Sequence, residues 1–186
     1  LGADLVINGE RRFSGVLQTK FDSLKLPTAS EADMASMVLF LHNKQSRLIR
    51  LVALKGDFPF YGTIETQPAD AYEKMKTGKY AMLDETLASQ YEVSSDDSIR
   101  VGNSIFRVAG VVTRIPGGGG IMATFTPSVY IAMDELDSTR LVQFGSRVNY
   151  KQYFKTESNE QTEQALARLK PLIRKSGFSY ETVEGR

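Results

Sequence analysis

Residues 34–54 read MASMVLFLHNKQSRLIRLVAL, and this stretch decides the fold of the chain. It holds two runs rich in apolar and β-branched residues, 34–41 and 47–54, separated by the polar segment His42–Ser46, whose length suits a hairpin turn. Near their centres both runs are apolar at nearly every position, which is typical of strands covered on both faces. We therefore expect a β-hairpin buried on both sides.

The residues before this hairpin predict a strand and a helix. Asp4–Ile7 is a short apolar strand candidate. Ser14 precedes apolar residues at helical spacing, which predicts a short helix over about 14–24 that ends before Pro27. The apolar positions of this helix are Val16, Leu17, Phe21 and Leu24.

The clearest helix signal lies near the other end of the chain. Ser158 and Gln161 fit the S-x-x-Q capping box, and Gly177 suits a helix stop. Pro171 lies inside the pattern and predicts a kink or an irregular turn. The apolar stripe of this helix consists of Leu166, Leu169, Leu172 and Ile173.

The two chain ends have similar patterns. Residues 1–54 predict β-α-β-β and residues 146–184 predict β-α-β, whereas the middle of the chain is richer in strands and short helices. The sequence therefore predicts an α+β fold with two lobes. A βαβ-type lobe would be built from both chain ends, residues 1–55 and 143–186, and a β-rich lobe of residues 56–142 would be inserted into it. The two ends of the chain would then lie close together.

Two local features are expected in the inserted segment. Ile99–Val101 and Ile105–Thr113 flank Gly102-Asn103, which indicates a hairpin on a Gly-Asn turn. Asp84 precedes a short helical pattern over 85–91, so we expect its side chain to cap that helix.

The lobe boundaries are expected near Gly56 and Val142, where βαβ patterning changes to short strands. Hinges are often found at such element ends. If each lobe has a sheet of its own, residues 62–113 should not pair in the same sheet as residues 34–54.

Composition excludes several classes of function. The chain of 186 residues has 23 Lys and Arg against 22 Asp and Glu, a net charge of +1, which argues against binding nucleic acid through bulk charge. It has no cysteine, which excludes a thiolate nucleophile and a Cys zinc site. The single histidine, His42, has no nucleophile motif near it, so we interpret it as a turn residue. No apolar run approaches the ~18 residues that span a membrane.

Two other motifs are also better explained by structure than by catalysis. The Gly117–Gly120 loop lacks the Gly-Lys-Ser/Thr of a P-loop and is interpreted as a flexible connection. Asp96 and Asp97 could serve as an acid and base pair, but turns favour aspartate, so we interpret them as turn residues. We predict neither hydrolytic activity nor nucleotide binding.

Apolar clusters beside Gly and Pro form the best candidate for a working surface, because rigid aromatic side chains anchor interfaces. The alternative is that these residues fill the end of a core, and the residue types leave both open. If they are core, Phe60→Ala should cost roughly 3–5 kcal/mol of stability. The candidates for contact with a substrate or partner are Phe58, Phe60, Tyr61, Ile121, Met122 and Phe125.

Several segments resemble one family of membrane proteins. Leu1–Ile7 looks like the stretch after the first transmembrane helix of FtsX-like ABC transporter permeases, whose extracytoplasmic part is a MacB-type periplasmic core domain. Phe58–Gly62, Asp97–Gly102 and Ile105–Val112 are similar to segments of the YbbP-like branch of that family. The most specific match is Leu141–Tyr150.

The matches follow the family's order over about residues 1–150, with two departures. Asp96 stands where the family has the glycine of a Gly-Asp turn, and Tyr61 stands where it has an arginine. Beyond residue 156 only the β-α-β pattern agrees.

The resemblance implies a non-catalytic domain outside the cytoplasmic membrane, between the first two membrane helices, with a membrane-proximal porter-like lobe and a sabre-like lobe. It implies no cofactor in this domain, since a separate ATPase subunit binds ATP, and a permease that is dimeric or paired with a second half. Its task would be to transmit ATP-driven helix motion to a hydrophobic or lipid-linked envelope substrate or to a partner protein. A free-standing periplasmic binding or chaperone module is the alternative, and a carboxylate hydrolase is a distant third.

Overall fold

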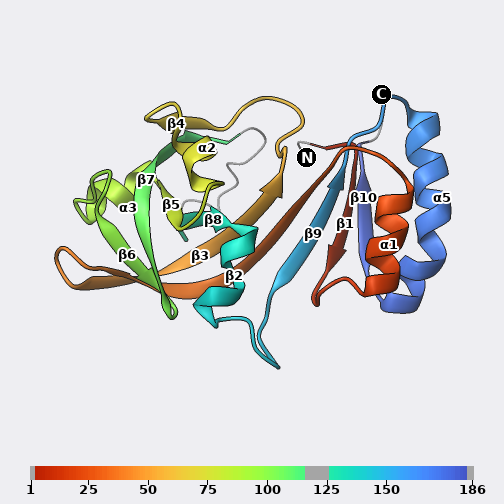
Figure 1. Cartoon of the computed structure of the whole chain (residues 1–186). Coiled ribbons are helices and arrows are strands. Elements are labelled where there is room, and N and C mark those ends of the chain that lie inside the picture. Colours follow the sequence, from red (N-terminus) through yellow and green to blue (C-terminus); the bar gives the residue numbers. More distant parts are fainter. Residues whose placement is uncertain (1–2, 116–125, 184–186) are drawn as a thin grey trace.

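The computed structural model of the chain describes residues 3–115 and 126–183. Its strands are β1 (Leu5–Gly9), β2 (Thr28–Phe40), β3 (Gln45–Gly56), β4 (Glu65–Gln67), β5 (Tyr80–Asp84), β6 (Ser98–Val101), β7 (Ser104–Arg114), β8 (Ser128–Ala132), β9 (Asn149–Phe154) and β10 (Ser179–Thr182). Its helices are α1 (Gly15–Ser23), α2 (Ala71–Met75), α3 (Glu85–Gln90) and α5 (Asn159–Ser176), and the 3-10 turns are η1 (Met133–Glu135) and η2 (Asp137–Thr139). The predicted mixed α+β fold with two lobes is confirmed (Figure 1).

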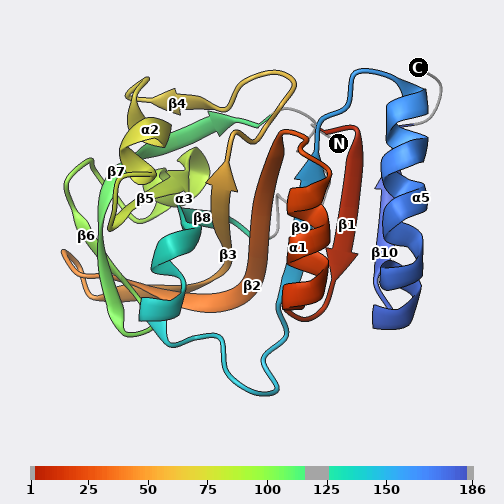
Figure 2. The ribbon, with the colours of Figure 1, turned by 45° about the vertical axis from the view of Figure 1, so that its right-hand side comes forward.

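The first lobe is an antiparallel sheet in the order β10-β1-β9-β2, with α1 and α5 on one face (Figures 1 and 2). Successive side chains of a strand point to opposite faces, so Leu5 and Ile7 contact the helices while Val6 lies on the other face. The core between this sheet and the helices consists of Leu5, Ile7, Leu17, Phe21, Phe154, Ala165, Leu166, Leu169 and Ile173.

The short helix predicted near residue 14 and the helix predicted after Ser158 are both present and begin at the predicted caps. The Ser14 hydroxyl accepts a hydrogen bond from the Leu17 amide, and the Ser158 hydroxyl accepts one from the Gln161 amide. Gly177 ends α5 with φ at +72°, a conformation that favours glycine. The chain stays helical through Pro171, so the irregular turn that this residue predicted is absent.

The second lobe contains α2, α3 and strands β3 to β8 with the far half of β2 (Figure 1). β3 pairs with β8 and β5 with β7 in parallel, and the other pairs are antiparallel. The main core of this lobe includes Val38, Phe40, Ile49, Leu51, Leu83, Phe106, Val129 and Ile131.

The prediction that residues 62–113 would lie in a separate sheet from residues 34–54 is wrong. Val38 of β2 pairs with Val101 of β6, and β3 pairs with β8, which in turn pairs with β5. The physical reason is that a long hairpin exposes two edges of unpaired backbone groups, which the inserted strands satisfy. The two lobes, which are defined by their separate cores, therefore share one sheet. The domain bounds 1–55 with 143–186 and 56–142 stay a prediction.

Two local expectations also need correction. The Asp84 side chain makes no capping hydrogen bond to α3. The hairpin is covered on both faces only along Leu51–Leu54, because Met37 and Leu48, which pair across the strands, are 52% and 55% exposed. The outer part of the hairpin thus has one open face.

The two ends of the described chain lie close together, as the sequence predicted, and are hydrogen-bonded to each other. Leu5 of β1 pairs with Thr182 of β10, and the Val183 amide donates to the Asp4 carbonyl oxygen at 3.3 Å (Figure 1). Of the helices in the described part of the chain, none combines the length and the apolar character needed to cross a membrane.

Candidate functional site: a polar pocket between the lobes

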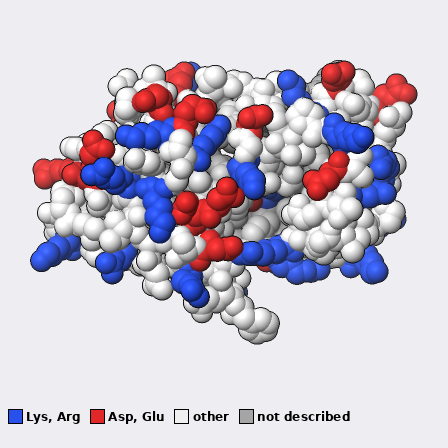
Figure 3. All heavy atoms as spheres, viewed as in Figure 1, with Lys and Arg blue, Asp and Glu red and all other residues white. Residues whose placement is uncertain are grey.

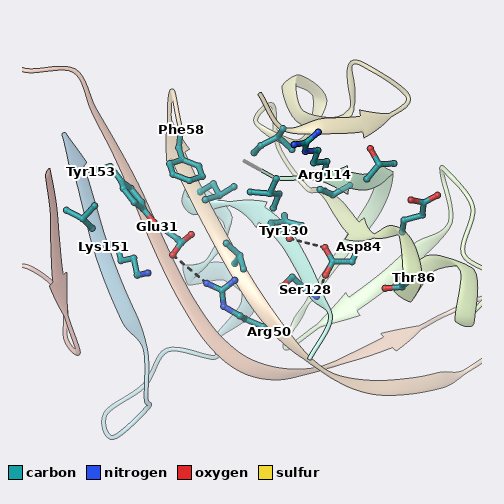
Figure 4. Close-up of a pocket in the computed structure, with 18 of the residues that line it drawn as sticks. Glu31, Arg50, Phe58, Asp84, Thr86, Arg114, Ser128, Tyr130, Lys151 and Tyr153 are labelled. Carbon is teal, nitrogen blue, oxygen red and sulfur yellow. Dashed lines mark hydrogen bonds and ion pairs between the residues drawn. The ribbon is translucent and has the colours of Figure 1, made fainter. Parts of the chain in front are cut away.

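A pocket of about 600 Å³ opens on the sheet face opposite α1 and α5, between the two lobes (Figure 4). Strand alternation places its lining. Val6 and Tyr153 point away from the helices that Leu5, Ile7 and Phe154 contact, and the pairing of Glu31 with Lys151 puts Glu31 on the same face as Val6 and Tyr153. The second lobe supplies an opposite wall that includes Ile64, Asp84, Val112 and Arg114.

Charged side chains of two adjacent strands meet on the floor of the pocket. Glu31 and Asp33 are two residues apart on β2, so both point to the face on which Arg50 of β3 lies. Arg50 Nη2 lies 3.1 Å from Asp33 Oδ2 and 3.6 Å from Glu31 Oε2. The Asn149 side-chain amide also donates to Asp33, at 3.3 Å. Arg50 is therefore held mainly by Asp33.

Of these charged groups, Glu31 has the least complete set of hydrogen-bond partners. It is only 8% exposed, and among the described residues its Oε2 atom has no hydrogen-bond donor. Burial raises its pKa, while the nearby positive charges of Arg50 and Lys151 oppose that rise. The pocket thus contains a buried carboxylate oxygen with spare capacity to accept a hydrogen bond.

Asp84, on the opposite wall of the pocket, is hydrogen-bonded to the neighbouring strand β8. Its carboxylate accepts from the Ser128 amide at 2.7 Å and from the Tyr130 hydroxyl at 2.9 Å (Figure 4). Burial raises the pKa of Asp84 despite these two hydrogen bonds, and it also raises the pKa of Tyr130. The side chain predicted to cap α3 instead links β5 to β8.

Comparison with known families identifies the chain. The family model described as MacB-like periplasmic core domain matches residues 25–172. The chain belongs to this family. As a MacB-like periplasmic core domain of an ABC transporter permease, it lies on the periplasmic side of the cytoplasmic membrane.

A curated relative and two solved structures agree with this membership. The chain is 28% identical over 114 residues to the uncharacterized ABC transporter permease YbbP of Escherichia coli strain K12, which is 61% of this chain and 14% of that protein. The extracellular domain of the noncanonic ABC-type transporter YknZ from Gram-positive bacteria is 12% identical with a TM-score of 0.58, over 97% of this chain and all of that one. The periplasmic region of MacB from Actinobacillus actinomycetemcomitans is 14% identical with a TM-score of 0.55, over 97% and 90%. The two structures support the fold alone.

Three of the predicted contact residues of this periplasmic core domain, Phe58, Phe60 and Tyr61, lie in the 57–64 loop, which joins β3 to β4. Phe58 and Phe60 are half-buried, and the Phe58 ring packs on Tyr153 of the first lobe at 4.7 Å between centroids. The exposed Tyr61 donates its hydroxyl to Asp4 Oδ2 at 2.7 Å. The loop thus connects the lobes and lines the pocket through Phe58, while its role in substrate or partner contact stays a prediction. Ile121, Met122 and Phe125 lie outside the described residues.

The turn roles of His42 and Asp97 are confirmed. His42 Nε2 lies 3.1 Å from the Tyr91 carbonyl oxygen, and Asp97 Oδ2 accepts from the Ser94 amide at 2.7 Å. Within residues 3–115 and 126–183, no three His, Asp or Glu side chains are grouped to hold a metal ion. On the face shown in Figure 3, acidic and basic side chains are interspersed, with no broad area of one sign.

The charged floor of the pocket was not predicted from the sequence. One signal was available, because Glu31 and Asp33 are acidic residues two positions apart within a β-rich segment next to the decisive hairpin. That spacing places both on one face of a strand, and Arg50 interrupts the apolar run on the facing strand.

The raised pKa of Glu31 predicts a pH-dependent cost of folding. The native state keeps the proton at pH values where the unfolded chain, with a pKa near 4.5, has released it. Stability should therefore fall as pH rises from about 4.5 towards the native pKa. The glutamine of Glu31→Gln has no proton to lose. The free energy of unfolding of this variant should therefore rise relative to that of the wild type as pH increases over this window. Urea denaturation at pH 4 to 8 measures the difference.

Glu163→Gln makes the same chemical change on an exposed position of α5 and serves as the control. If the free energy of unfolding of Glu31→Gln falls relative to that of the wild type as pH rises, the predicted sign is wrong.

Proposed function

We propose that this chain is the non-catalytic extracytoplasmic domain of an FtsX/MacB-like ABC transporter permease, and that it transmits ATP-driven movement of membrane helices. The recipient would be a hydrophobic or lipid-linked envelope substrate, or a partner protein. The observation that carries the proposal is the hydrogen-bonded pair of chain ends on the first lobe, Asp4 with Val183.

Membrane helices joined to these two ends would leave the domain side by side. A change in their tilt would act on β1 and β10, which pair with each other at one edge of the sheet. β1 is bonded to β9, β9 to β2, and the far half of β2 to β6 of the second lobe. A continuous run of backbone hydrogen bonds therefore links the tethered edge to the second lobe, which suits rigid-body transmission.

The 57–64 loop provides a second connection between the lobes. The Tyr61 hydroxyl bonds Asp4 beside the N-terminal end, and Phe58 packs on Tyr153. The Tyr72 hydroxyl of α2 donates to the Phe58 carbonyl oxygen at 2.6 Å. Two links at different points of the boundary resist bending between the lobes better than one.

The family also supports a set of partners. An ATPase subunit would bind ATP and act through the membrane helices of the permease, and the permease would be dimeric or paired with a second permease half. The interspersed charges give no support to a nucleic-acid partner.

Distance measurements in the full permease, assembled with its ATPase, test this proposal. The 186-residue chain has no cysteine, so within this domain a Gln45→Cys variant carries a single dye at the far end of the second lobe. Energy transfer to a dye on the membrane surface should change between the nucleotide-free state and an ATP-bound state arrested before hydrolysis.

A dye at Glu163→Cys on α5 of the first lobe is the matched control and should report a smaller change. Identical transfer efficiency at Gln45→Cys in every nucleotide state would refute mechanical transmission through this domain.

A further inference from the structure

The pocket between the lobes is not needed for transmitting movement, and it has the features of a binding site. We propose that it binds a zwitterionic small molecule with an apolar side chain, of the chemical class of the large apolar α-amino acids. This inference does not rest on the proposed function, because the domain could transmit movement with only water in the pocket.

The ammonium group of such a ligand would bind at Glu31. Its Oε2 atom is buried and lacks a hydrogen-bond donor among the described residues, and Arg50 at 3.6 Å is beyond hydrogen-bond distance. A buried carboxylate without a full set of donors is costly, so a ligand that donates N–H groups to it gains affinity.

The carboxylate of the ligand would bind at Lys151, next to Glu31. These two residues are directly opposite on β9 and β2, and such cross-strand pairs have Cβ atoms about 5 Å apart. Lys151 lines the pocket (Figure 4). None of the ion pairs within 4 Å among the described residues includes its ammonium group. Neighbouring sites for an anion and a cation match a molecule with both charges on one carbon atom.

The juxtaposition of Glu31 and Lys151 favours a zwitterion over an ion of one sign. Of the charged residues that line the pocket, Glu31 and Lys151 lie directly opposite each other on β2 and β9. Arg50 is paired with Asp33, which is not part of the lining. The other charged lining residues are Asp84, Glu85, Arg114 and Glu181. A simple amine would be attracted by Glu31 but repelled by Lys151. A simple carboxylate would be attracted by Lys151 but repelled by Glu31. A zwitterion satisfies both groups at once.

The rest of the pocket would hold the apolar side chain. Its walls include Val52, Leu54, Phe58 and Ile64, which lie beside the charged floor. A volume of about 600 Å³ lies within the usual range of roughly 300–1,000 Å³ for small-molecule sites, and an apolar lining with a few charged groups is typical of them. A ligand without an apolar side chain would leave these walls in contact with water.

Titration calorimetry of the 186-residue chain with L-phenylalanine tests the proposal. We expect saturable binding with a Kd below about 1 mM. Three analogues each remove one feature: 3-phenylpropionate lacks the ammonium group, phenethylamine lacks the carboxylate, and glycine lacks the apolar side chain. Each should bind at least about tenfold more weakly.

Variants locate the binding in the pocket. Glu31→Gln should weaken the binding of L-phenylalanine at least about tenfold without weakening the binding of 3-phenylpropionate. Lys151→Gln should also weaken the binding of L-phenylalanine at least about tenfold, without weakening the binding of phenethylamine. Glu163→Gln, outside the pocket, should leave all affinities unchanged. If Glu31→Gln does not fold, Lys151→Gln, a half-buried residue, decides alone.

Three results would overturn the proposal. The first is the absence of saturable binding of L-phenylalanine up to about 10 mM. The second is equal affinity for phenylalanine and phenethylamine, which would indicate a site for simple cations. The third is binding that neither pocket variant weakens.

Discussion

Truncation of Phe154 to alanine is expected to lower the free energy of unfolding by about 3–5 kcal/mol, the usual cost of deleting a buried phenylalanine. Phe154 lies on β9 and is fully buried between the first-lobe sheet and its helices. Its ring makes an edge-on contact with Phe21 of α1 at 5.3 Å between centroids. Alanine would lose the transfer energy of the ring and leave a cavity that α1 and α5 can only partly fill. Urea denaturation followed by circular dichroism measures the loss.

Phe144→Ala is the matched control, because Phe144 is fully exposed in the segment between η2 and β9. The same change there should alter stability by less than about 0.5 kcal/mol. Equal effects at the two positions would contradict the placement of the first-lobe core.

Gly102→Ala is expected to cost about 3 kcal/mol, for two reasons that add. Gly102 has φ at +56°, which disfavours any residue with a Cβ atom. A Cβ atom there would also lie 2.2 Å from the carbonyl oxygen of Thr139, a backbone atom that cannot move aside easily. The adjacent Asn103 amide donates to that same oxygen at 2.9 Å, so any shift would weaken this link between the β6–β7 turn and η2. Thermal and urea unfolding both report the change.

Gly78→Ala separates these effects from the general effect of replacing glycine. Gly78 does not have a positive φ, and a Cβ atom there would meet nothing within 4 Å. This variant should be neutral or slightly more stable, because alanine reduces the freedom of the unfolded chain. A Gly102→Ala protein as stable as the wild type would show that the close approach to Thr139 is not maintained in solution.

The pocket and the 57–64 loop together change the interpretation of the aromatic cluster. Phe58 and Phe60 are neither fully exposed nor fully buried, so neither of the two sequence-based alternatives describes them completely. Phe58 packs between the two lobes and also lines the pocket. A residue in that position can affect stability and ligand binding at once, so variants of Phe58 need both measurements.

Local patterns in the sequence determined the elements of this fold. The capping residues Ser14 and Ser158 marked the starts of α1 and α5, and Gly177 marked the end of α5. The polar turn after β2 and the Gly-Asn turn after β6 marked two hairpins. These predictions succeeded because caps, turns and periodicity depend on residues only a few positions apart. The family resemblance also came from local segments, and the comparison with known families confirmed it.

Tertiary structure alone decided how these elements pair and what their polar side chains contact. The single sheet depends on pairing between strands that are far apart in sequence, such as β2 with β6, and no local pattern encodes which strand satisfies an open edge. Asp84 had the local signature of a helix cap, yet Ser128 and Tyr130, over forty residues away, supply its hydrogen bonds. The pocket arises in the same way, because Glu31, Arg50 and Lys151 come from three strands. They meet only when the register of the sheet places them on one face.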